Sequence, residues 1–156
     1  MSELEKYIKT YFGVSSDDLQ KISSFFKPTA LTKNDYFLKT GRYCDKLGFV
    51  QTGIIREFVI HNDKEVTKWI STSGYFVVDL SSFVFQQTAR WNIQALTDCE
   101  LFVINQKDYQ QIGEAIPKWA ELEKTIHRKM LYRFRRQNFI TPVNDSRRTL
   151  QQTFQF

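Results

Sequence analysis

The stretch GRYCDKLGFVQTG, residues 41–53, has a glycine at each end and a mostly apolar run between them. Gly41 and Gly53 stand where a sharply turning chain needs a positive backbone φ, which glycine adopts without the steric cost of a side chain. The apolar side chains available to fill an interior are Leu47, Phe49 and Val50. The pattern predicts a buried strand between two tight corners of a β-barrel.

The segments on either side of this stretch have a similar residue pattern. Residues 25–104 consist of short runs rich in β-branched and aromatic residues, separated by Gly, Asn, Asp and Ser at close spacing, which is typical of strands joined by turns. An antiparallel hairpin is predicted where the sequence HNDK separates residues 54–60 from residues 65–70. Roughly eighty residues of short strands favour a sandwich or jelly roll.

Helices are predicted on both sides of the strand region. Residues 1–24 carry apolar residues at helical spacing, and Ser15 offers a cap within them. After the strands, Asn105 is a predicted cap for a short helix that ends near Gly113. We therefore expect a mainly β fold with flanking helices.

A longer helix is predicted over residues 117–140. Pro117 suits the first helical position, and apolar side chains recur every three or four residues over about five turns. They are Trp119, Leu122, Ile126, Met130 and Phe134. This stripe suits packing on the barrel or against a second copy of the chain. The expected organisation is helices and barrel in 1–116, the long helix in 117–140 and an irregular tail in 141–156.

The composition argues against several classes of protein. With 156 residues, 42% of them hydrophobic, the chain suits one compact domain. No apolar run approaches the ~20 residues that cross a bilayer, and the start lacks a signal-peptide pattern, so we expect no membrane contact and a cytoplasmic location. The sulfur and imidazole groups are those of Cys44, Cys99, His61 and His127, which are too few for a disulfide scaffold or a usual metal centre. We predict no metal site, and two buried, unreactive thiols.

The positive charge lies at the C-terminal end. Residues 1–117 hold 13 Lys and Arg against 14 Asp and Glu, a net −1, whereas residues 118–156 hold 9 against 3, a net +6. A basic end suggests contact with nucleic acid or another polyanion, although a solvated helix face is the commoner cause.

The motifs together resemble one known family. Residues 41–53 have a glycine turn, a small residue three positions later, an apolar strand and a second glycine, like the first signature of cyclic-nucleotide-binding domains. The likeness continues through residues 74–76 and 93–104 and the finish after Pro117. Over about residues 15–140 the chain resembles the sensor half of the Crp/Fnr family of bacterial transcription regulators. The resemblance implies a double-stranded β-helix (jelly-roll) barrel of cyclic-nucleotide-binding-domain type, with a long C-terminal helix that forms a homodimer.

The ligand-binding segment departs from that family. Its members use a Gly-Glu pair at the start of a short helix and a later Arg to hold the ribose and the phosphate of a cyclic nucleotide. A gap-free count from Cys99 places Val78 and Asp79 at the Gly-Glu positions and Ala89 at the arginine position, with Arg90 one residue later. A one-residue offset in a strand reverses the face of a side chain. The candidate pocket residues are Val78, Asp79, Leu80, Ala89, Arg90, Trp91, Phe134 and Arg135.

These departures argue against the family's usual cyclic AMP binding, so we expect no cofactor. Two interpretations of Asp79 and Arg90 stay open: a remodelled site for an acidic or phosphate-like ligand, or a surface ion pair worth about 0–1 kcal/mol on a degenerate pocket. Crp/Fnr regulators read DNA through a winged helix-turn-helix, and no such pattern follows Ile140. A truncation, a reading-frame change or a natural single-domain form would each account for this.

The sequence favours a non-catalytic sensor domain with an unknown small-molecule effector. One alternative is a small-molecule enzyme on a cupin-like barrel, which needs a clustered His and carboxylate metal set. His61 in a turn and His127 on a helix do not supply one. Another alternative is a ligand-free dimerisation module.

Overall fold

The computed structural model describes residues 2–125, 127 and 128. The named helices of this part are α1 (Glu3–Phe12), α2 (Ser16–Ser24), α3 (Leu80–Phe85) and α4 (Gln106–Ala115). The strands are β1 (Lys27–Leu31), β2 (Tyr36–Leu38), β3 (Lys46–Thr52), β4 (Ile55–His61), β5 (Lys64–Ser71), β6 (Phe76–Val77), β7 (Asn92–Ala95) and β8 (Cys99–Asn105).

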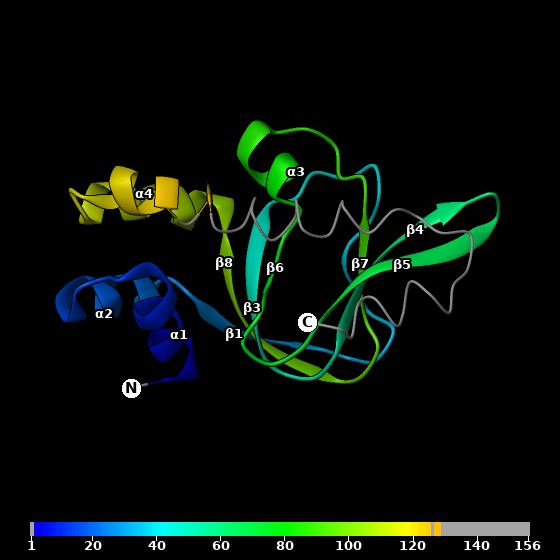
Figure 1. Ribbon diagram of the computed structural model, residues 1–156, viewed down its shortest axis with the longest axis horizontal. Helices are drawn as coiled ribbons and strands as arrows, with labels where there is room; N and C mark the ends of the chain where they lie inside the picture. The colour runs from blue at the N-terminus through cyan, green and yellow to red at the C-terminus, as the bar shows by residue number, and fades with distance from the viewer. Residues whose placement is uncertain (1, 126, 129–156) are drawn as a thin grey trace.

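The strands form two four-stranded antiparallel sheets, in the orders β1-β8-β3-β6 and β2-β7-β4-β5. The first sheet lies on the side of α1, α2 and α4, and the second lies on the opposite side (Figure 1). Val50 and Val77 of the first sheet and Ile55 and Ile93 of the second are all 0% exposed. The core therefore lies between the two sheets, and the predicted mainly β architecture with flanking helices is confirmed.

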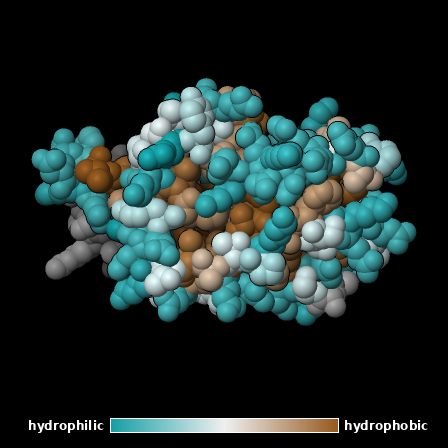
Figure 2. Space-filling view, turned by 180° about the vertical axis from the view of Figure 1, so that it is seen from behind, coloured by the Kyte–Doolittle hydropathy of each residue, from teal (hydrophilic) through white to brown (hydrophobic). Residues whose placement is uncertain are grey.

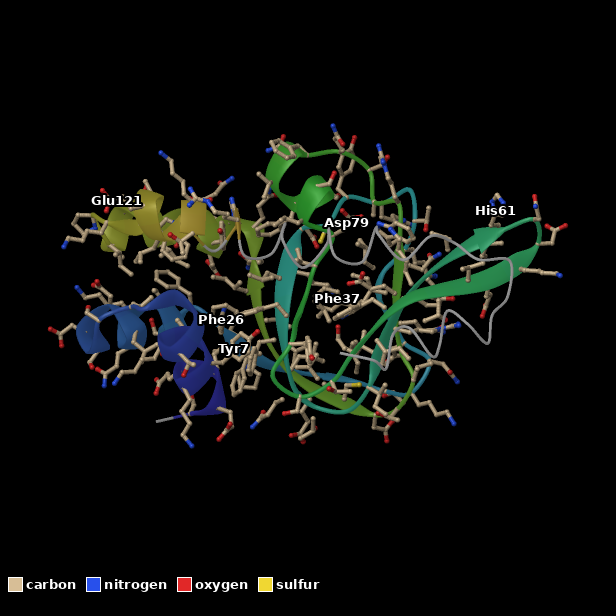
Figure 3. All side chains as sticks on the ribbon, viewed as in Figure 1. Tyr7, Phe26, Phe37, His61, Asp79 and Glu121 are labelled. Carbon is tan, nitrogen blue, oxygen red and sulfur yellow. The ribbon has the colours of Figure 1, made fainter. Side chains whose placement is uncertain are left out.

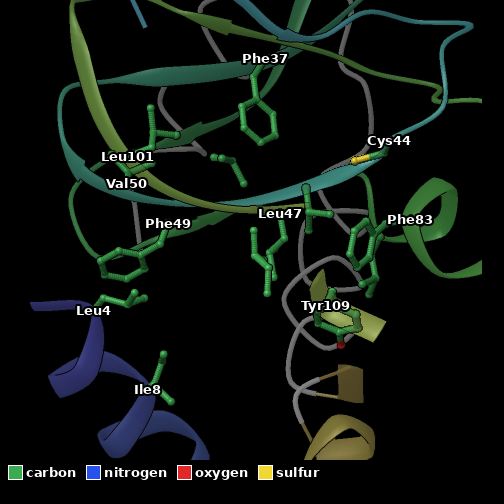
Figure 4. Packing of buried hydrophobic residues seen from close by; sticks show 14 of the residues in the cluster. Leu4, Ile8, Phe37, Cys44, Leu47, Phe49, Val50, Phe83, Leu101 and Tyr109 are labelled. Atoms are coloured by element: carbon green, nitrogen blue, oxygen red, sulfur yellow. The ribbon is translucent and has the colours of Figure 1, made fainter. Parts of the chain in front are cut away.

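The N-terminal helices form where the sequence offers caps. Ser2 and Glu5 make a capping box at the start of α1, and the Ser15 side chain accepts the Asp18 N–H at the start of α2. Figure 4 shows Leu4 and Ile8 of α1 on the side of the sheet that carries Phe49. Burial of this apolar face holds the helices against the first sheet.

The predicted hairpin is β4 and β5, joined by Asn62 and Asp63. Both turn residues have positive φ, 51° and 60°, which suits a two-residue hairpin turn. The pairing is irregular at one point, because Glu57 pairs with Trp69 whereas the next residue, Phe58, pairs with Thr67. Lys68 is therefore the extra residue of a β-bulge.

The chain after α4 is described only over the first part of the range predicted for the long helix. Residues 117–118 form a turn, and residues 119–125, 127 and 128 are helical. Trp119 is 5% exposed, and its ring packs edge-on against Tyr109 of α4 at 5.6 Å between centroids. Leu122 also packs against the core, so the start of the stripe already has a partner within the chain. The rest of the predicted stripe and site lies outside the described residues: Ile126, Met130, Phe134 and Arg135.

The face opposite to that of Figure 1 is mainly polar. Seen from behind, apolar side chains reach the surface only in places between polar ones (Figure 2). Among the described residues, the most exposed large apolar side chains are those of Phe85, Ile60 and Tyr43. None of the described helices has the length and apolar character that a membrane crossing requires.

Candidate functional site

Asp79 lies at the start of α3 and is turned into the protein. The side chain is 6% exposed, and its carboxylate accepts two backbone N–H groups. Oδ1 accepts from Ser82 and Oδ2 accepts from Arg90, each at 3.1 Å. Ser82 lies three residues further on in α3, so Asp79 is also the N-cap of that helix. Both carboxylate oxygens are thus used to hold the α3 segment together.

Arg90 contributes its backbone to Asp79, while its side chain is exposed. Among the described residues no side-chain ion pair joins Asp79 to Arg90. The arrangement differs from the surface pair considered from the sequence, because the acidic partner is buried and binds main chain.

Ala89 ties the end of the α3 segment to the glycine-rich stretch. Its N–H donates to the Arg42 carbonyl at 2.7 Å, and its carbonyl accepts the Gly41 N–H at 2.9 Å. Nearby, the Cys44 N–H donates to Ser82 Oγ at 2.8 Å. The segment that would have to adapt to a phosphate is therefore fastened at several points by its own hydrogen bonds.

Three of the other predicted pocket residues are neighbours of Asp79 or Arg90 in the chain. Val78 and Leu80 are buried beside Asp79, and Trp91 is half-buried. Cys44 and Cys99 are buried as predicted, and burial raises the pKa of the Cys44 thiol to about 11, which disfavours the reactive thiolate.

Glu57 is a site residue that the sequence did not single out. It lies on β4, is 4% exposed, and pairs with Trp69 of β5 and Ile93 of β7. Burial and, to a lesser extent, the nearby negative charge of Asp79 raise the pKa of its carboxyl group to about 8, and the charge of Lys68 opposes this shift. At neutral pH Glu57 is therefore mostly an uncharged hydrogen-bond donor.

Lys68 reaches the same region from β5. Its Nζ lies 3.5 Å from the centroid of the Trp91 ring, close enough for a cation–π contact. Because β5 and β7 lie on either side of β4, the Lys68 side chain extends across β4 towards the start of β7. Partial burial lowers the pKa of Lys68, as does the charge of Arg90, whereas Glu57 and Asp79 raise it.

Comparison with known proteins gives the family. Residues 28–115, more than half of the chain, match the model of the cyclic nucleotide-binding domain. The chain belongs to the cyclic nucleotide-binding domain family. No curated protein sequence matches it.

Solved structures share the cyclic nucleotide-binding fold. A cyclic nucleotide-binding domain from Methylobacillus flagellatus has a TM-score of 0.78 at 18% identity, covering 90% of this chain and 82% of that one. The catabolite activator protein of Thermus thermophilus has a TM-score of 0.71 at 18% identity, covering 88% and 61%. The regulatory domain of Toxoplasma gondii PKA, solved with cAMP, has a TM-score of 0.63 at 14% identity, covering 70% and 43%. The chain thus spans less than two thirds of the last two chains.

Within this cyclic nucleotide-binding domain, the sequence carries a weak signal for Glu57 and little for Lys68. Glu57 stands two positions after Ile55, so strand alternation places both on one face of the strand. Phe58 and Ile60 lie on the other face, together with Arg56, so the sequence does not show which of the two faces is buried. The direction of the Lys68 side chain depends on the β-bulge, and no residue pattern in β5 predicts that bulge.

A second polar cluster lies between α4 and the helical residues that follow Pro117. Tyr109 Oη lies 3.0 Å from His127 Nε2 and 3.4 Å from Glu123 Oε1. Burial raises the pKa of Tyr109, and the Glu123 charge adds to this shift. Burial lowers the pKa of His127, against the charge of Glu123. The Tyr109 ring also packs edge-on against Phe83 of α3 at 5.0 Å, so this cluster connects α3 with the helix after Pro117.

His61 belongs to neither cluster. It is the last residue of β4, at the far end of the hairpin from Asp79 (Figure 3). Within the described part of the chain, no three His, Cys, Asp or Glu side chains gather in a way that could hold a metal ion.

Proposed function

We propose that this chain is the sensor domain of a Crp/Fnr-type bacterial transcription regulator, non-catalytic, which binds a small effector inside the barrel beside α3. The family match and the likeness to the Thermus catabolite activator protein support this proposal. Binding would act by shifting the balance between arrangements of the helix that follows α4. The Phe83–Tyr109–Trp119 contacts give α3 a packed connection to that helix.

The position of the Asp79 carboxylate is the observation that supports an effector other than cyclic AMP. A nucleotide phosphate needs free N–H groups at the start of the short helix and a positive side chain opposite them. Here Asp79 already occupies the N–H groups of Ser82 and Arg90. A bound phosphate would have to displace a buried carboxylate of the same charge, so we propose an effector other than cyclic AMP.

Thermal unfolding with added ligands tests the proposal. The purified chain is melted with millimolar cyclic AMP, cyclic GMP and a panel of small carboxylic acids. An effector at ~100 times its dissociation constant adds about 2.7 kcal/mol of stability, which raises Tm by about 5–10 °C for a chain of this size. We expect such a rise with an acid and none with cyclic AMP. A rise with cyclic AMP that Arg90→Ala abolishes would contradict the proposed effector class. No rise with any compound would favour the dimerisation module.

We also propose that the chain is a homodimer through the apolar stripe of residues 117–140. Trp119 packs within its own chain, so the contact would rest on the later positions of the stripe. Ile126→Glu should then give monomers in light scattering. The matched control is Lys124→Glu, an exposed position on the same helix, which should leave the dimer mass unchanged. A dimer that survives Ile126→Glu would remove this part of the proposal.

A further inference from the structure

The polar contacts of Tyr109 join α4 to the helical residues that follow Pro117. Tyr109 belongs to α4, whereas Glu123 and His127 lie four positions apart, which places both on one face of the later helix. Tyr109 Oη lies 3.0 Å from His127 Nε2 and donates to Glu123 Oε1 at 3.4 Å, and His127 Nε2 lies 3.6 Å from Glu123 Oε1. One hydroxyl group on α4 therefore meets both side chains of the later helix.

The ring of Tyr109 makes the apolar part of the same contact. It packs edge-on against Phe83 of α3, with 5.0 Å between centroids, and edge-on against Trp119, with 5.6 Å. The His127 imidazole lies nearly parallel to it, with 13° between the planes and 6.4 Å between the centroids. The helix after Pro117 is thus held to α4 at two places, by Trp119 at its start and by His127 about two turns later.

His127 is the member of this cluster that changes charge near neutral pH. An unperturbed imidazole has a pKa of about 6.5. The His127 side chain is 21% exposed and that of Glu123 is 32% exposed, so both are partly shielded from water. Burial lowers the pKa of His127, and the charge of Glu123 opposes this shift. Burial raises the pKa of Tyr109, so its hydroxyl keeps its proton throughout the range in which His127 titrates.

The elements that meet at this cluster bring little charge to His127. α4 presents the uncharged Tyr109 hydroxyl, and α3 has the sequence LSSFVF, which contains no charged side chain. Among the described residues, Glu123 is the one whose charge affects the pKa of His127, while Lys124 and Arg128 beside it are exposed. The Glu123 pair is long and partly open to water, so it offsets only part of the cost of burying a charged imidazole.

We propose that His127 is a pH-sensitive latch, which holds the helix after Pro117 against α4 while it is neutral and releases that helix when it is protonated. The neutral ring packs on Tyr109 and shares its hydroxyl, whereas the charged ring gains more from water than from a half-buried site. The assignment rests on the proposed function in one respect, because it takes the packed connection from α3 to this helix as the output of the sensor. It makes proton concentration a second input to that output.

The direction of the latch follows from the difference between the docked and the released ring. A released imidazole is solvated and has the ordinary pKa of about 6.5, whereas the pKa of the docked ring is lower. Below pH 6.5 the released form therefore binds a proton that the docked form does not. One proton per molecule raises the population of the released form by up to about tenfold per pH unit, until the docked ring is protonated as well.

Hydrogen exchange of the full chain, measured by NMR, tests the latch without an effector. The probes are the backbone amides of residues 122–125, where the Leu122 N–H donates to the Lys118 carbonyl at 3.2 Å. Protection factors remove the intrinsic pH dependence of exchange. They should fall by about two- to tenfold between pH 7.5 and pH 5.5. The Val50 N–H, which donates to the Tyr75 carbonyl at 2.9 Å in the barrel, is the internal control, and its protection should not fall.

Matched variants separate His127 from other groups that titrate. His127→Gln keeps a polar side chain without its titration, so the protection of residues 122–125 should no longer fall in acid, and His127→Asn is the second variant should the first fail to fold. His61→Gln is the matched control and should keep the wild-type response, because His61 lies at the opposite end of the molecule from Glu121 of the latched helix (Figure 3). Tyr109→Phe keeps the ring without the hydroxyl, so protection at pH 7.5 should fall by roughly 2–10-fold, as the loss of one hydrogen bond implies.

Several results would overturn the latch. They are protection of residues 122–125 that stays level or rises in acid, a wild-type pH response in both His127 variants, and protection at pH 7.5 that Tyr109→Phe leaves intact. The sensor proposal fails separately. If a compound raises Tm while the acid response persists in both His127 variants, the sensor stands and the latch falls. If no compound raises Tm while His127→Gln removes the acid response, the latch stands and its role in a sensor falls.

Discussion

Replacing Gly53 by alanine should destabilise the barrel far more than the same replacement at Gly41. Both glycines have a positive φ, 103° at Gly53 and 84° at Gly41, so both variants carry the backbone cost of an L side chain in this region, about 1–2 kcal/mol. The surroundings differ. A Cβ at Gly53 would lie 2.5 Å from Cys99 Sγ and 2.6 Å from the Asp98 carbonyl, whereas a Cβ at Gly41 would meet nothing within 4 Å.

The steric cost at Gly53 can be bounded from these distances. The atoms it meets belong to Asp98 and to Cys99, the first residue of β8, including Cys99 Cα at 2.9 Å. Backbone atoms cannot turn aside as the tip of a side chain can, and forced overpacking costs about 1–3 kcal/mol. The total is about 2–5 kcal/mol for Gly53→Ala against about 1–2 kcal/mol for Gly41→Ala.

Thermal unfolding followed by circular dichroism measures the difference. With about 2–4 °C per kcal/mol, Tm should fall by about 4–20 °C for Gly53→Ala and by about 2–8 °C for Gly41→Ala. Chemical denaturation with an unchanged m-value would confirm that the folded state is the one affected. Equal losses in the two variants would refute the reasoning, because the close approach to β8 is the difference between them.

Three further predictions concern the two polar clusters. The pKa of Glu57 is about 8 in the folded state, above its unfolded value of 4.5. The free energy of unfolding of the wild type should therefore fall by up to about 1.4 kcal/mol per pH unit as the pH rises from 4.5 to 8. Urea unfolding at pH 5 and pH 8 should show a smaller fall for Glu57→Gln. Asp79→Ala leaves two backbone N–H groups without their acceptor and should lose about 1–3 kcal/mol for each, against a smaller loss for Asp79→Asn in the same denaturation assay. Glu123→Gln removes the charge that supports protonated His127, so an NMR titration should find its pKa lowered further, whereas Glu121→Gln, at an exposed position, should leave it unchanged.

The fold was largely predictable because its signals are local. Gly41 and Gly53 do have positive φ at the corners around β3, and the Asn62–Asp63 turn joins the two strands that alternation predicts. Asn105 caps α4 as expected, although the helix runs to Ala115, two residues past the predicted end at Gly113. Each of these features depends on residues within a few positions of one another.

The site was harder to predict because it depends on contacts between distant segments. Asp79 was singled out, but its bond to the N–H of Arg90, eleven residues away, follows from the path of the chain around α3. Glu57 was not singled out, because its burial depends on which face of β4 the second sheet turns inwards. The sequence pattern alone could not distinguish these arrangements.

The bulge in β5 makes the length of that strand a determinant of its chemistry. Deleting one residue at the bulge would restore regular pairing with β4, and side chains beyond that point would exchange faces. The contact between Lys68 Nζ and the Trp91 ring would then be lost even though every other residue of the barrel was unchanged. Related barrels can therefore gain or lose a cation–π contact of this kind through a single-codon insertion or deletion, which a comparison restricted to substitutions would overlook.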